Sequence, residues 1–154
     1  MSARIIQSIE ELLALAGREV GVSDWIEVSQ DRITEFADAT GDHQWIHLDT
    51  ERASRESPYR ATVAHGFLSL SLLPALVRKV VRYGPAFPLT VNYGLNRVRF
   101  PAPVRAGAQV RGRFRLASAE PFEGGVQLCW SAQVEAQDSG KPCVVAEWLT
   151  RVYR

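Results

Sequence analysis

The sequence contains no long apolar run. No stretch reaches the roughly 18 apolar residues that a membrane-spanning helix needs, and the first residues, Met1-Ser2-Ala3-Arg4, lack the apolar segment of a signal peptide. The two cysteines, Cys129 and Cys143, provide neither a disulfide framework nor a metal-like spacing. We therefore expect a cytoplasmic protein that does not contact a membrane.

An excess of either charge is also missing. Lys and Arg number 18 against 17 Asp and Glu, so no overall field attracts the protein to nucleic acid. The chain is 46% hydrophobic and 23% charged, which is typical of globular proteins, and its 154 residues are the usual length of one domain. We predict a single domain over residues 1–154.

The second half of the chain alternates apolar and polar residues with a period of two. This pattern predicts antiparallel strands over about residues 89–100, 110–116, 126–136 and 144–153. The apolar residues change from odd-numbered to even-numbered positions between Gly94 and Arg97. This change predicts one extra residue, a β-bulge, there. Trp25, Ile26 and Val28 indicate a further strand nearer the N-terminus.

A second feature is the segment from His65 to Arg82, which is apolar on nearly every side of a helix. It predicts a buried central helix over about residues 65–82, kinked at Pro74 because proline cannot donate a backbone hydrogen bond. A curved antiparallel sheet with one apolar face would wrap around it. The fold class is α+β, and the alternative is another α+β sheet with its helices on one side.

Two short stretches carry residues suited to chemistry. Asp42 and His47 lie five residues apart, just after a helix that we expect to end at Gly41, and His65-Gly66 opens the central helix. Together they offer a base, an acid and a helix N-terminus, the groups needed to add water across a bond next to a carbonyl. Taken singly, Asp42 is more simply explained as a turn cap, and the two histidines as structural residues.

The combination resembles the MaoC-like family of (R)-specific enoyl-CoA hydratases and dehydratases. That family carries a Gly-Asp-x-Asn-Pro-aliphatic-His signature, and this chain has Gly41-Asp42-His43-Gln44-Trp45-Ile46-His47. Ala64-His65-Gly66 and Arg99-Phe100-Pro101-Ala102-Pro103-Val104 match two further family segments in the same order. Gln44 and Trp45 replace Asn-Pro, as in the nodulation-protein-N-like branch. The resemblance implies the hot-dog fold, a curved sheet wrapped around a long helix.

The resemblance also implies roles for individual residues. Asp42 would be the general base on a water that His47 shares, and His47 would deliver the proton to the α-carbon. The Gly66 N–H would hydrogen-bond the thioester carbonyl. The substrate would be an acyl-CoA or acyl-carrier thioester, with coenzyme A as part of the substrate and no cofactor, and the protein would be a homodimer.

Other residues would line the substrate site. Gln44 takes the place of the loop-supporting Asn, His65 begins the central helix, and Ser69 lies one turn further along it, where it can face the acyl chain or bond back to its own helix. Asn96 and Arg97, at the expected bulge, are placed to touch a ligand. We expect burial near Trp45 and Ile46 to raise the pKa of Asp42.

Competing interpretations remain at this stage. The Arg111-Arg113-Arg115 stripe could bind coenzyme A phosphates, although a solvated outer sheet face is simpler. A zinc site made by Asp42, His47 and the two other histidines has no helical spacing to support it, so we predict no metal. A hot-dog thioesterase and a non-catalytic acyl-thioester binding module would both fit the fold.

Overall fold

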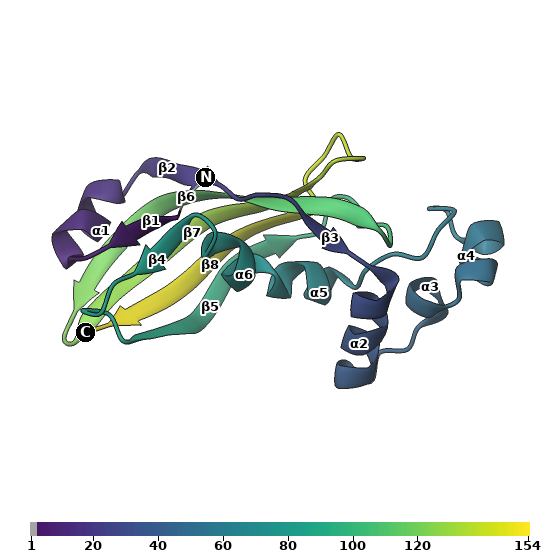
Figure 1. Ribbon diagram of the computed structural model, residues 1–154, viewed down its shortest axis with the longest axis horizontal. Helices are drawn as coiled ribbons and strands as arrows, with labels where there is room; N and C mark the ends of the chain where they lie inside the picture. The colour runs from purple at the N-terminus through teal and green to yellow at the C-terminus, as the bar shows by residue number, and fades with distance from the viewer. Residues whose placement is uncertain (1–2) are drawn as a thin grey trace.

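The computed structural model describes residues 3–154 (Figure 1). Its helices are α1 Ile9–Leu15, α2 Gln30–Thr40, α3 Trp45–Leu48, α4 Thr50–Glu56, α5 Gly66–Ser71 and α6 Leu73–Val77. Its strands are β1 Arg4–Ile6, β2 Arg18–Val22, β3 Ile26–Val28, β4 Val81–Tyr83, β5 Leu89–Arg99, β6 Ala108–Phe122, β7 Gly125–Ala136 and β8 Val144–Tyr153. No helix among these residues is long and apolar enough to cross a membrane.

The main sheet is antiparallel, as the alternating pattern predicts, and it has six strands, including β2, which the pattern did not predict. Its order is β2-β6-β7-β8-β5, and β3 pairs with β6 beyond β2, so the segment near Trp25 contributes to a broken edge of two short strands. In β7 every second side chain is buried, because successive side chains point to opposite faces. β1 and β4 form a separate parallel pair. The predicted bulge is confirmed, since the β5–β8 register shifts between Asn92 and Gly94 and again between Leu95 and Arg97.

The central helix is shorter than the sequence predicts. The expectation of one helix over about residues 65–82 is wrong: α5 ends at Ser71, α6 begins at Leu73 and ends at Val77, and the chain then enters β4. Pro74 lies in the first turn of α6, where its missing N–H costs least, and this separates the two helices. After Val77 the chain does not continue as a helix, and residues Val81–Tyr83 instead pair as β4 with β1.

The two helices lie along the concave side of the sheet, and α2, α3 and α4 gather beyond one end of it (Figure 1). Gly112 in β6 allows the close approach of α6, because a Cβ at this position would lie 3.0 Å from Cβ of Leu76. Large buried side chains of the sheet and helices form one cluster: Leu68, Leu73, Leu76, Phe114, Leu116, Leu128, Trp130 and Trp148.

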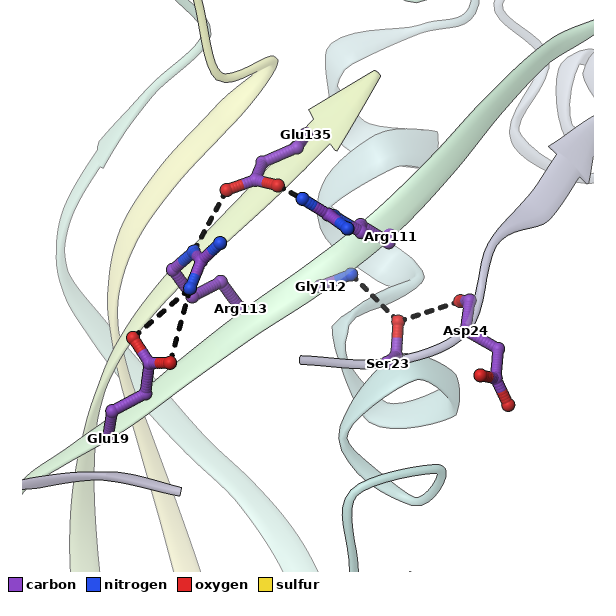
Figure 2. Close-up of polar contacts among 7 residues, drawn as sticks. All are labelled: Glu19, Ser23, Asp24, Arg111, Gly112, Arg113 and Glu135. Carbon is purple, nitrogen blue, oxygen red and sulfur yellow. Dashed lines mark hydrogen bonds and ion pairs between the residues drawn. The ribbon is translucent and has the colours of Figure 1, made fainter. Parts of the chain in front are cut away.

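The arginine stripe lies on the outer face of the sheet; Arg111 and Arg113 pair with acidic side chains (Figure 2), and Arg115 donates to the Gly17 carbonyl. Arg111 and Arg113 donate to the two carboxylate oxygens of Glu135, at 2.8 and 2.9 Å, and Arg113 reaches both oxygens of Glu19 at 3.2 Å. Partial burial opposes ionisation of Glu135, but the bonds from Arg113 and Arg111 hold its pKa below the ordinary value. The outer-face interpretation of these arginines is therefore correct.

A buried hydroxyl joins this face to the chain before β3. The Ser23 hydroxyl accepts a hydrogen bond from the Gly112 N–H at 2.9 Å and donates to the Asp24 carbonyl at 2.9 Å (Figure 2). The Ser23 N–H in turn donates to the Gly112 carbonyl at 2.8 Å. Ser23 thus satisfies the backbone of β6 at the gap between β2 and β3, where strand pairing is interrupted.

Candidate active site

The segment after α2 carries the predicted chemistry. Gly41 ends α2 with φ +78° and donates its N–H to the Ala37 carbonyl at 2.8 Å, as the sequence predicts for a helix stop. The chain then turns into α3, a single helical turn that the sequence analysis did not predict. His47 lies on this turn, and only 6% of its surface is exposed.

The protonation state of His47 follows from its contacts. Its Nδ1 lies 2.6 Å from the Val63 carbonyl oxygen. Because a carbonyl only accepts hydrogen bonds, Nδ1 carries a proton and donates it, and in the neutral ring Nε2 keeps a free lone pair. Burial lowers the pKa of His47, although the Val63 bond opposes this effect. His47 is therefore a neutral imidazole that can accept a proton at Nε2.

His65 connects this loop to the start of α5. Its Nε2 donates to the backbone carbonyl of Asp42 at 2.9 Å, and its ring stacks on His47 with centroids 3.7 Å apart and planes 24° apart. The ring of Phe36 also packs against the His65 ring, with centroids 5.0 Å apart. The Nδ1 atom of His65 is buried and has no hydrogen-bond partner among residues 3–154. His65 thus fixes Asp42 and His47 relative to each other.

Asp42 presents its carboxylate at the surface. Its Oδ1 accepts a bond from the Gln44 N–H at 3.3 Å, so the residue also caps the turn, as the simpler interpretation predicts. The expectation that Asp42 is buried near Trp45 and Ile46 is wrong for the single chain, because Asp42 is exposed and the Trp45 ring instead packs under Arg52 at 4.1 Å.

Three residues that the sequence analysis missed hold α3 in place. Gln30 donates its amide to the His47 carbonyl at 2.8 Å and accepts from the Thr62 hydroxyl at 2.6 Å. The Val63 N–H donates to the Ile46 carbonyl at 3.0 Å. No spacing in the sequence indicates these contacts, since Gln30 reads only as the residue after a helix cap. His47 is consequently bonded through both its backbone and its ring.

A cavity of about 360 Å³ opens beside His47. Gly66 and Ser69 of α5 also line it, together with Ile46, Tyr59, Val63, Ala64, Phe100, Pro101, Ala102, Pro103, Val104 and Cys143. The Gly66 N–H donates to no acceptor in the described part of the chain, and the Phe100 ring lies against Gly66, 3.0 Å from where a Cβ would stand. The buried Ser69 hydroxyl bonds back to the His65 carbonyl at 3.4 Å while still facing the cavity.

The structure brings together five of the predicted site residues, namely Asp42, His47, His65, Gly66 and Ser69. Gln44, Asn96 and Arg97 stand apart from them. Gln44 is an exposed residue that precedes α3, and Asn96 and Arg97 are exposed on β5. None of these three lines a cavity described here.

Asp42, His47 and His65 also have side chains that can bind a metal ion. One atom each from Asp42, His47 and His65 lie within 4.8 Å of one another. An ion binds an imidazole in the plane of the ring, and the planes of the two stacked rings are only 24° apart, so one ion could bind both only after a ring rotates. The absence of a resident metal stays a prediction, which chelator treatment tests.

Comparison with known proteins identifies relatives along nearly the whole chain. The model of the MaoC like domain matches residues 12–127. The chain is 47% identical to 3-hydroxyacyl-thioester dehydratase Z of Mycobacterium tuberculosis over 149 residues, covering 96% of this chain and 97% of the relative. It is 43% identical to nodulation protein N of Rhizobium leguminosarum over 145 residues, covering 93% and 89%.

The fold has solved counterparts as well. An unliganded R-hydratase from Pseudomonas aeruginosa superposes with a TM-score of 0.70 at 24% identity, covering 90% of this chain and 82% of that one. This likeness confirms the hot-dog arrangement of a curved antiparallel sheet around central helices. The protein therefore belongs to the MaoC-like domain family and is an enzyme of the hydratase and dehydratase class.

Proposed function

We propose that the protein hydrates trans-2-enoyl thioesters to (R)-3-hydroxyacyl thioesters, or catalyses the reverse dehydration. The observation that carries this proposal is the neutral, buried His47, which keeps a free lone pair on Nε2 and has a ring nitrogen within 4.8 Å of a carboxylate oxygen of Asp42. The cavity beside His47 also holds the unpaired Gly66 N–H. The dehydratase named among the relatives acts on 3-hydroxyacyl thioesters, which agrees with this chemistry.

The reaction needs one proton to move. A water bound between Asp42 and His47 donates one O–H to the carboxylate and the other to Nε2, and its oxygen adds to the β-carbon of the enoyl group. The pair takes up the proton that the water loses, and His47 Nε2 delivers a proton to the α-carbon. The pair starts and ends as a carboxylate and a neutral imidazole, so atoms and charges balance.

This scheme refines the acid role that the resemblance implies for His47. A histidine whose Nδ1–H is already donated to Val63 can begin as an acid at Nε2 only as an imidazolium, and burial disfavours that form. We therefore assign His47 as the group that first accepts and then returns the proton, and Asp42 as the base that orients and polarises the water.

The Gly66 N–H would bind the thioester carbonyl as negative charge develops on it. Removing one such donor typically costs about 3 kcal/mol of transition-state stabilisation. Gly66 suits the role because its N–H has no partner in the described part of the chain. Glycine also has no side chain, so the carbonyl can approach its backbone closely. Coenzyme A or an acyl-carrier group would be part of the substrate, and no cofactor is required by this chemistry.

We also propose that the working form is a homodimer joined along β5. This strand has a free edge in the sheet, and it lies among exposed apolar side chains: Phe67, Leu89, Tyr93, Leu95 and Phe100. Phe67 is 72% exposed, which is unusual for so large an apolar residue unless a partner covers it. A second chain there would shield Asp42 and the cavity from water. Thioester substrates of this kind agree with the cytoplasmic location that we expect.

The first experiment measures the loss of enoyl-thioester absorbance on mixing the protein with crotonyl-CoA. We expect turnover that Asp42→Asn and His47→Ala each reduce by about 10²–10⁴-fold without unfolding the protein. His43→Ala is the matched control, because His43 is an exposed histidine in the same loop whose ring pairs with the exposed Asp38. Unchanged rates in both site variants would overturn the proposal, and release of free thiol would indicate a thioesterase.

A further inference from the structure

A larger cavity lies beside the two central helices. It has a volume of about 410 Å³ between α5, α6 and the middle of the bulged strand β5, and its lining is mostly apolar. Its walls are Phe67, Leu70, Ser71, Leu73, Pro74, Asn92, Tyr93, Gly94, Leu95 and Trp148. We call it the outer chamber. A mostly apolar chamber of this size fits a hydrocarbon chain.

A smaller cavity of about 190 Å³ continues from it. We call it the inner chamber, and its lining adds seven residues, of which Arg78 and Thr90 are exposed and the others are buried or half-buried: Val77, Arg78, Val81, Tyr83, Thr90, Trp130 and Thr150. Pro74, Asn92 and Trp148 line both chambers and so stand between them. The Trp148 indole N–H donates to the Asn92 side-chain carbonyl at 3.1 Å, which connects β8 to β5 across this boundary.

The outer chamber adjoins the catalytic groups through two aromatic residues. Gly66 lines the cavity beside His47, and the next residue, Phe67, lines the outer chamber. The Phe67 ring meets the Phe100 ring edge-on, with centroids 6.2 Å apart, and Phe100 in turn lies against Gly66. A thioester whose carbonyl binds the Gly66 N–H therefore has apolar space on both sides, with the larger volume in the outer chamber.

We propose that the Trp148–Asn92 hydrogen bond forms the end wall of the acyl site and restricts the enzyme to short acyl chains. This inference rests on the proposed hydratase function. A short chain ends within the outer chamber, whereas a longer chain reaches the indole and must displace it to enter the inner chamber. Displacement would leave the buried indole N–H, on a residue that is 5% exposed, without its acceptor.

The test compares trans-2-dodecenoyl-CoA with crotonyl-CoA as the ratio of their kcat/KM values. Asn92→Ala removes the acceptor from an exposed strand residue, and Trp148→Phe removes the donor while keeping an aromatic ring in the core. Each variant should raise the ratio by about tenfold or more, because a few methylene groups of the long acyl chain could then bind in the inner chamber. In the Asn92→Ala background, Val77→Phe should cancel the gain by filling the inner chamber.

The control is Val145→Ala, an exposed residue of the neighbouring strand β8 that lines neither chamber, and it should leave the ratio unchanged. A ratio that is the same in the parent protein, Asn92→Ala and Trp148→Phe would overturn the proposal, provided that melting curves show both variants folded. A wrong hydratase assignment would give a different result, because the parent protein would then not turn over crotonyl-CoA at all.

Discussion

The neutral state of His47 predicts the sign of the pH dependence. His47 is 6% exposed, its ring hydrogen-bonds to an uncharged carbonyl and to no other group among residues 3–154, and burial lowers its pKa from the ordinary 6.5. If His47 must first accept a proton, kcat/KM should be level near neutral pH. It should then fall by about tenfold for each pH unit once the pH drops below the lowered pKa.

The assay is the initial rate of crotonyl-CoA hydration at low substrate concentration between about pH 5 and pH 8. The acid limb should have its midpoint below 6.5. The reasoning would be refuted by a rate that instead falls as the pH rises through this range, because a starting imidazolium would produce that sign. A flat profile would show that His47 does not control the rate by titration between pH 5 and pH 8.

Stability must be measured over the same range, because the same pKa shift affects folding. A histidine whose pKa is lowered in the folded state stabilises the protein fully above 6.5, and this contribution is lost as the pH falls through the folded-state pKa. Brief assays at a temperature well below the melting point at each pH separate this effect from catalysis.

The other predictions concern positioning and packing. His65→Phe, which keeps the ring but loses the donor to the Asp42 carbonyl, should lower kcat about 10²-fold with little change in KM, whereas His65→Gln should recover part of the rate by donating from its amide. Gly112→Ala, measured by chemical unfolding, should cost about 1–3 kcal/mol because its Cβ would lie 2.5 Å from the Phe114 ring and 3.0 Å from Cβ of Leu76. Ser23→Ala should cost about 1–3 kcal/mol by the same measurement, since it leaves the buried Gly112 N–H unpaired. A chelator should change neither turnover nor melting temperature if no metal is resident.

Alternation in the later strands predicted the sheet, because side chains in a strand with one buried face must alternate. The parity change near Gly94 located the bulges for the same reason. The helix from His65 was overestimated, since apolarity on all sides reveals burial but not where a helix ends. There the pairing of β4 with β1, which depends on residues far away in the sequence, decided the outcome.

The motif around Asp42 and His47 predicted that these residues lie near Gly66, and the structure places them so. It could not predict that His47 is neutral, because the tautomer depends on the distant Val63 carbonyl. It could not identify Gln30 either, since its contacts to His47 and Thr62 arise only when α2 packs beside α3. Asn96 and Arg97 were predicted to touch a ligand only because they lie at the expected bulge. A bulge can direct a side chain to either face of the sheet, so its position does not show which face they occupy.

The irregular edges of the sheet limit how chains can add to it. At one edge, β5 shifts register twice within its pairing to β8, and at the other edge β2 and β3 are separate short strands. Neither edge offers a long, even row of backbone donors and acceptors, so strands of further molecules find no template for continuous addition. In the homodimer that we propose, pairing would end when the two matching β5 edges meet, and the exposed apolar side chains of β5 would be covered.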